Sequence, residues 1–185
     1  MDGRTLPLYK RPVDIVMCLL FAYYIWSCLF VERHYCRREL TANEEDPILQ
    51  AAYEYSRDWN PLFLARPEWL RVATCISAYV LCCGYLVGLF TFILGKDSFR
   101  VPLLMFVSFK LYAISFYYYF EFFGEMAAPH VGMFLAADGP YLLGILLLLF
   151  RLRKPNPFQE TSIKQDWTGN SDLCWATNSL VCHCF

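Results

Sequence analysis

Four long apolar runs, separated by polar segments, dominate the pattern of the chain. They cover residues 13–31, 72–94, 101–123 and 131–150. Each run is close to the ~20 residues that a helix needs to cross the hydrocarbon core of a bilayer. The first run is too long for the apolar region of a signal peptide, and bulky aromatic residues stand where a cleavage site would be. The pattern predicts four transmembrane helices and an all-α fold, a membrane four-helix bundle.

The polar segments divide the chain into a leader, 1–12, a membrane domain, 13–155, and a polar tail, 156–185, that we expect to be disordered. The first loop is long and extramembrane, and it carries six basic and eight acidic residues between Glu32 and Arg71. Within this loop, the spacing of apolar residues from Ile48 to Tyr55 predicts a short amphipathic helix on the membrane surface.

The distribution of positive charge predicts the orientation. The side that holds both termini carries nine Lys and Arg residues, against six in the first loop and none in the third. Cytoplasmic segments carry the excess of Lys and Arg in membrane proteins. We therefore expect both termini to be cytoplasmic.

Composition supports a membrane protein of one small unit. The 185 residues are 57% apolar, above the usual ~45–50% of a soluble domain. The net charge of −1 gives no reason to expect a nucleic-acid partner. Cys18, Cys28, Cys75, Cys82 and Cys83 lie in apolar runs and are interpreted as small buried hydrophobic residues.

The remaining cysteines are the candidates for pairing or modification: Cys36, Cys174, Cys182 and Cys184. No Cys/His spacing suits a zinc site, and we expect neither a metal nor a cofactor. The second span contains the small-residue pair Gly84 and Gly88, which allows another helix to come close. A homodimer through this face is one arrangement that the pair would permit.

Two charged residues lie inside the predicted spans. Lys110 is near the middle of the third span, and Asp138 stands with Gly139 and Pro140 in the fourth. Insertion scales assign a cost of about 2.5–3.5 kcal/mol to such a charge, so it normally faces protein, water or ligand. The two spans are joined by a short loop and should be antiparallel neighbours. We therefore predict an ion pair between Lys110 and Asp138, with a polar spot in an apolar cavity as the alternative for Asp138.

Several motifs together resemble the EXPERA family of membrane proteins. They are NPLFLARPEWLRV before the second span, FRVP at the start of the third and PYLLGILLLLFRLRKP in the fourth. The similarity is greatest to the sigma-2 receptor branch, which is related to the emopamil-binding sterol isomerases. It implies a four-helix bundle with a cavity that opens to the bilayer and accepts sterols or cationic amphiphiles, in the endoplasmic reticulum.

The resemblance carries over to this chain residue by residue. The acid after the first span matches Glu32, and the Tyr of Pro-Tyr-Leu-Leu matches Tyr141. Where that branch has an Asp before Pro-Leu, this chain has Asn60. Where the branch has an acid in the second span, this chain has Ser77. Asp138 departs from the branch.

Two functions follow as hypotheses. The first is a binding protein for a sterol, terpenoid or cationic amphiphile, with ligand contacts from Glu32, Asn60, Tyr117, Asp138 and Tyr141. The second is an isomerase that moves a double bond by protonation and deprotonation. Its catalytic acids would be Glu32, Glu121 and Asp138, because the His and Glu of the sterol isomerases correspond to Tyr24 and Cys28 here.

The helical spacing brings these residues together. Lys110, Ile114, Tyr117 and Glu121 share one face of the third span. The first and third spans end on the side away from the termini, where the fourth begins. We therefore predict that one cavity in that half of the bundle is bordered by Glu32, Glu121, Asp138 and Tyr141.

Overall fold

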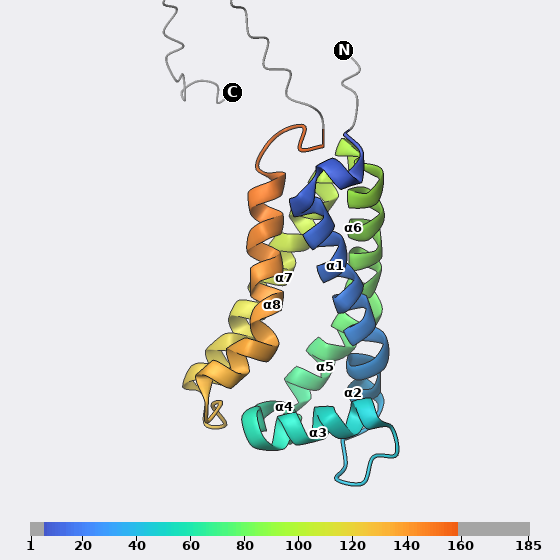
Figure 1. Ribbon diagram of the computed structural model, residues 1–185. Coiled ribbons are helices and arrows are strands. Elements are labelled where there is room, and N and C mark those ends of the chain that lie inside the picture. The colour runs from blue at the N-terminus through green and yellow to red at the C-terminus, as the bar shows by residue number, and fades with distance from the viewer. Residues whose placement is uncertain (1–5, 159–185) are drawn as a thin grey trace, which may run out of the picture.

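The protein is all-helical. The computed structural model describes residues 6–158, which form helices and no strand. Four helical stretches are long and apolar enough to cross a membrane: Pro12–Arg37, Glu68–Leu94, Asp97–Phe123 and Val131–Leu152. They run up and down side by side, so the described chain begins and ends at the same end of the bundle (Figure 1). The all-α class and four apolar helices of spanning length are confirmed.

The first two spans are each interrupted by one π-helical segment. The first consists of α1 (Pro12–Ser27), η2 (Cys28–Glu32) and α2 (Arg33–Arg37). The second consists of α5 (Glu68–Ile76), η3 (Ser77–Leu81) and α6 (Cys82–Leu94). The π segments pack together, with the Cys28 Sγ donating to the Ser77 carbonyl oxygen at 3.7 Å. Such segments re-aim side chains and are frequent at functional sites.

The third and fourth spans are antiparallel neighbours, as predicted. A short turn, η4 (Asp97–Phe99), leads into α7 (Arg100–Phe123), which packs on α8 (Val131–Leu152). Pro140 lies inside α8. The Tyr24 hydroxyl donates to the Pro140 carbonyl at 2.5 Å, and the Tyr118 hydroxyl donates to the Asp138 carbonyl at 2.9 Å. Neighbouring helices thus supply hydrogen bonds to the backbone around the proline, as an apolar environment requires.

The glycines of the spans allow close packing inside the bundle. A Cβ atom at Gly84 would collide with the ring of Phe106, and one at Gly88 would collide with the ring of Phe21. The small-residue face therefore receives phenylalanine rings of the same chain. The homodimer through Gly84 and Gly88 stays a prediction.

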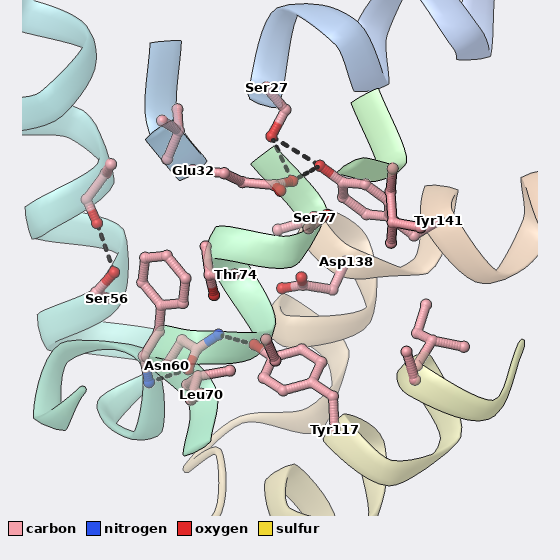
Figure 2. Close-up of a pocket in the computed structure, with 18 of the residues that line it drawn as sticks. Ser27, Glu32, Ser56, Asn60, Leu70, Thr74, Ser77, Tyr117, Asp138 and Tyr141 are labelled. Atoms are coloured by element: carbon pink, nitrogen blue, oxygen red, sulfur yellow. Dashed lines mark hydrogen bonds between the residues drawn. The ribbon is translucent and has the colours of Figure 1, made fainter. Parts of the chain in front are cut away.

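The first loop forms an ordered cap of two helices. α3 (Pro47–Trp59) and α4 (Pro61–Ala65) lie across the end of the bundle away from the termini (Figure 1). Asp46 caps α3 by accepting from the Ile48 backbone amide at 2.8 Å. The Asn60 Oδ1 accepts from the Phe63 amide at 2.9 Å and begins α4 (Figure 2). The predicted helix is present, and its apolar face buries Leu49 against Tyr35 and Leu40, whereas its place on the membrane surface stays a prediction.

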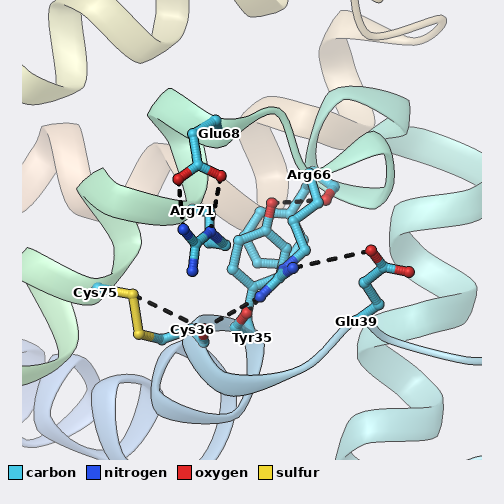
Figure 3. Close-up of polar contacts among 8 residues, drawn as sticks. Tyr35, Cys36, Glu39, Arg66, Glu68, Arg71 and Cys75 are labelled. Carbon is cyan, nitrogen blue, oxygen red and sulfur yellow. Dashed lines mark hydrogen bonds and ion pairs between the residues drawn. A yellow bond between two sulfur atoms is a disulfide. The ribbon is translucent and has the colours of Figure 1, made fainter.

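A group of contacts that we call the latch fastens the cap to the first two spans (Figure 3). A disulfide joins Cys36 at the end of the first span to Cys75 in the second. Arg66, in the left-handed backbone region with φ of 50°, donates to the carbonyl oxygens of Tyr35 at 3.0 Å and Cys36 at 3.1 Å. The Tyr35 hydroxyl donates to the Phe63 carbonyl at 2.9 Å. The latch ties α2, α4 and α5 together.

The disulfide corrects one prediction. Cys75 is not an inert hydrophobic residue, because the end of α5 places its sulfur beside Cys36. An apolar sequence context did not reveal this partner, which is 39 residues away. Cys36 was correctly identified as a candidate for pairing, whereas Cys174, Cys182 and Cys184 lie outside the described residues.

We predict that Cys36→Ser lowers the free energy of unfolding by about 3–4 kcal/mol, because a cross-link between residues 39 positions apart restricts the unfolded chain. Chemical unfolding in detergent, with and without reductant, measures the change. Cys83→Ser is the matched control, since Cys83 is a free, exposed cysteine. Equal stability of the wild type and Cys36→Ser under non-reducing conditions would contradict the prediction.

Candidate functional site

A cavity of about 290 Å³ lies between the cap and the four spans (Figure 2). Every long span and both cap helices contribute to its wall. The polar lining includes two carboxylates, one lysine and several hydroxyl groups, and the rest is aromatic and aliphatic. Its polar and aromatic lining residues include Tyr23, Trp26, Ser27, Glu32, Tyr55, Asn60, Ser77, Lys110, Tyr117, Asp138 and Tyr141.

Glu32 enters the cavity from the π segment of the first span. Its Oε1 is 3.5 Å from the Ser27 hydroxyl and 3.5 Å from the Tyr141 hydroxyl. The Tyr141 hydroxyl also lies 2.7 Å from the Ser27 Oγ. A carboxylate, an aliphatic hydroxyl and a phenol from the first and fourth spans therefore form one polar cluster (Figure 2).

Asp138 enters the same cavity from α8. Its Oδ2 accepts a hydrogen bond from the Tyr55 hydroxyl of α3 at 2.9 Å. Burial of the phenol, followed by the negative charge of Asp138, raises the pKa of Tyr55 above its usual range. Tyr55 thus stays protonated at neutral pH and remains a donor to Asp138. The contact connects the cap to the fourth span.

Lys110 lines the cavity from α7. Its Nζ is 3.4 Å from the Ser77 Oγ, and it stands 5.6 Å from the ring centre of Tyr85 and 5.5 Å from that of Tyr141. Cation–π attraction of this kind stabilises an ammonium group by about 0.5–2 kcal/mol. Lys110 is therefore held by a hydroxyl and two aromatic faces.

The structure does not form the predicted ion pair between Lys110 and Asp138. Both side chains line the cavity, but their charged groups do not come within 4.0 Å of each other in the described chain. The physical reason is that each has another partner: Tyr55 for Asp138, Ser77 and the tyrosine rings for Lys110. The alternative interpretation, a polar spot in an apolar cavity, describes Asp138 better.

Asn60 and Tyr117 hold the floor of the cavity together. The Asn60 Nδ2 donates to the Tyr117 hydroxyl at 2.6 Å, while its Oδ1 caps α4. Asn60 is only 2% exposed. Both ends of its amide are thus engaged, which gives it a positioning role between the cap and α7, and its predicted contact with a ligand stays a prediction.

Glu121 differs from the prediction. It is completely buried and is not among the residues that line the cavity. Neither carboxylate oxygen has a hydrogen-bond partner among the described residues. Of the four residues predicted to border one cavity, Glu32, Asp138 and Tyr141 do so, and Glu121 lies outside its wall.

Sequence reasoning missed the hydroxyl groups that accompany the acids. Tyr55 was recognised only as part of an amphipathic helix, although it binds Asp138 directly. Ser27 adjoins Glu32 because the first span turns into its π segment between them. Apolar periodicity gives no signal for a π segment, so the sequence could not place Ser27 beside Glu32, and the Tyr55 contact depends on how the cap folds over the bundle.

The lining combines apolar walls with a few polar groups. Tyr23 and Trp26 form part of the wall, and each is 41% exposed. Glu32, Asp138 and Lys110 supply two negative charges and one positive charge to the cavity. The arrangement can hold an apolar molecule that presents an ammonium or hydroxyl group, and its acids can exchange protons with a bound molecule.

Comparison with protein-family models, curated proteins and solved structures finds no match to this chain. The EXPERA resemblance therefore stays a prediction. The features that the structure supports are four apolar helices of spanning length and the capped cavity between them.

We predict that Tyr55 and Asp138 are energetically coupled. A double-mutant cycle of Tyr55→Phe and Asp138→Leu should give a coupling of about 1.5–3 kcal/mol, the usual contribution of a hydrogen bond to a charged group. Chemical unfolding in detergent provides the measurement. The parallel cycle of Lys110→Met with Asp138→Leu is the control and should give a smaller coupling. A larger coupling in the lysine cycle would indicate an ion pair between Lys110 and Asp138 and would contradict Tyr55 as the main partner of Asp138.

Proposed function

We propose that the protein binds a sterol, terpenoid or cationic amphiphile in the capped cavity. It would act in lipid or sterol homeostasis as an integral membrane protein of the sigma-2 receptor type. The observation that carries this proposal is the placement of Glu32 and Asp138, from different spans, in one largely apolar cavity. Pockets for small ligands typically combine apolar walls with a small number of placed polar groups.

The volume of the cavity supports a ligand that is only partly enclosed. Ligand pockets usually measure about 300–1,000 Å³, and this cavity is at the lower end with about 290 Å³. It fits the polar end of a sterol-sized molecule. The apolar remainder would extend past Tyr23 and Trp26, whose partly exposed rings continue the aromatic wall outward.

The charges favour a ligand with an ammonium or hydroxyl group. The surplus of one negative charge among Glu32, Asp138 and Lys110 attracts a cation. The tyrosine and tryptophan faces add cation–π attraction. For a neutral hydroxyl group, Lys110 is a donor, and the hydroxyls around Glu32 can donate or accept.

The latch supports the proposed location in the endoplasmic reticulum with cytoplasmic termini. Disulfides persist in oxidising compartments such as the lumen of that organelle. The Cys36–Cys75 disulfide lies at the end of the bundle away from the described termini. A lumenal disulfide thus agrees with the orientation expected from the Lys and Arg count.

Isomerisation of a double bond is the second candidate function, favoured by the presence of two acids around one cavity. A protonated carboxyl group would donate its proton to one alkene carbon, leaving a carbocation at the other. The second carboxylate would remove a proton from the carbon next to the cation, which forms the shifted double bond. Aromatic faces would stabilise the cation. Glu32 and Asp138 are the candidate acids, since Glu121 does not line the cavity.

Lipid mass spectrometry of the purified protein tests the proposal. Binding predicts a sterol, terpenoid or amine-bearing lipid that co-purifies stoichiometrically and is unchanged after incubation. Conversion of that lipid into a double-bond isomer would instead establish the enzyme. Purification without such a lipid, and failure to take one up from added sterols or cationic amphiphiles, would contradict both functions.

We predict that Glu32→Gln and Asp138→Asn each weaken the binding of a cationic amphiphile about tenfold or more, since each removes a charge-assisted contact. Radioligand or fluorescence titration measures the affinity. Glu125→Gln is the matched control, because Glu125 is exposed and does not line the cavity. Unchanged affinity in both cavity variants, with the protein still folded, would show that the ligand binds elsewhere.

A further inference from the structure

A second cavity lies at the opposite end of the bundle, beside the described termini. Its volume is about 330 Å³. It is formed where η1 (Leu8–Lys10) leads into α1 and where α8 ends. Five cationic side chains and one carboxylate line it: Lys10, Arg11, Arg151, Arg153, Lys154 and Asp14.

Asp14 holds two of the cations in place. Its Oδ2 accepts from the Arg11 Nη1 at 2.7 Å, and its two oxygens accept from Arg151 at 2.5 and 2.9 Å. Asp14 is completely buried, and the Arg11 side chain is 5% exposed. Phe158 packs against both guanidinium groups, at 5.4 Å from Arg11 and 5.2 Å from Arg151. The two guanidinium groups are therefore fixed before any ligand arrives.

This arrangement leaves positive charge and one buried donor unused. A single carboxylate cannot neutralise two guanidinium groups. The Nε of Arg11 is buried and has no hydrogen-bond partner among the described residues. Within residues 6–158, Lys10, Arg153 and Lys154 form no ion pair within 4.0 Å. The Arg11 Nε is enclosed, so an added anion would meet the uncompensated charge of the cationic side chains that line the cavity.

We infer that this cavity binds a phosphate group, either on a lipid headgroup or as free phosphate. The four positive charges in excess are more than enough to neutralise a phosphate monoester, whose charge is between about −1.5 and −2 at neutral pH. Arginine provides planar N–H donors that suit phosphate oxygens, and lysine adds mobile point charges. The ends of α1 and α8 place the site where a headgroup would lie. This inference does not depend on the proposed function of the capped cavity.

A general excess of positive charge near the spans does not explain the site equally well. Such residues act from the surface and need no cavity. Here Arg11 is buried, its guanidinium is fixed by Asp14 and Phe158, and its remaining donor is unpaired. Lys96 provides a comparison, because it is exposed at the same end of the bundle and does not line the cavity.

The test uses native mass spectrometry of the full chain in phosphatidylcholine nanodiscs, with phosphatidic acid or inorganic phosphate as the probe. We expect the double variant Lys10→Gln and Lys154→Gln to bind phosphate about tenfold more weakly than the wild type, because two charge-assisted contacts are lost. These exposed lysines are chosen because Arg11 and Arg151 also hold Asp14. Lys96→Gln, the matched control, should bind as the wild type does.

The two sources of phosphate give different results. Retention of phosphatidic acid that inorganic phosphate does not displace supports a lipid headgroup. Binding of inorganic phosphate whose occupancy does not fall when phosphatidic acid is added supports free phosphate. The inference is overturned if neither probe binds, if the double variant binds both probes as the wild type does, or if Lys96→Gln weakens binding as much as the double variant.

Discussion

The cost of charge at membrane depth is the constraint on which the rest of this structure depends. A charged side chain in the hydrocarbon costs several kcal/mol unless it faces protein, water or a ligand. At one end of the bundle, Asp14 is enclosed by two arginines. At the other, Glu32, Asp138 and Lys110 turn toward a cavity and receive hydroxyl groups and aromatic faces. The charges thus require an interior polar space at each end of the bundle.

The cap makes the larger polar space possible. α3 brings the Tyr55 hydroxyl to Asp138, and Asn60 joins the cap to α7 through Tyr117. The latch keeps these groups in register, because Arg66 and the disulfide bind the end of the first span to the start of the second. Two adjoining π segments then aim Glu32 and Ser77 into the same space. The cavity is therefore built by the extramembrane loop as much as by the spans.

Much of the fold could be predicted from the sequence, because hydropathy and helical periodicity are strong signals over lengths of about 20 residues. The four spans, the amphipathic α3 and the joint placement of Glu32, Asp138 and Tyr141 follow from them. Contacts that depend on the cap could not be predicted. The prediction paired Lys110 with Asp138 because they lie at similar depth on neighbouring spans. Helical spacing gave no indication that the Tyr55 hydroxyl would bind Asp138. The role of Asp14 was likewise missed, because its partner Arg151 is 137 residues away in the sequence.

Photo-crosslinking tests the central claim, that the capped cavity is where a ligand binds. A cationic amphiphile with a diazirine beside its ammonium group would be irradiated in the presence of the folded protein, and the adducts would be mapped by peptide sequencing. The account predicts adducts on residues that line the cavity, such as Trp26, Tyr117 and Tyr141, and their loss when unlabelled amphiphile competes. Adducts confined to outward-facing residues such as Met105 and Tyr112, unaffected by competition, would contradict it.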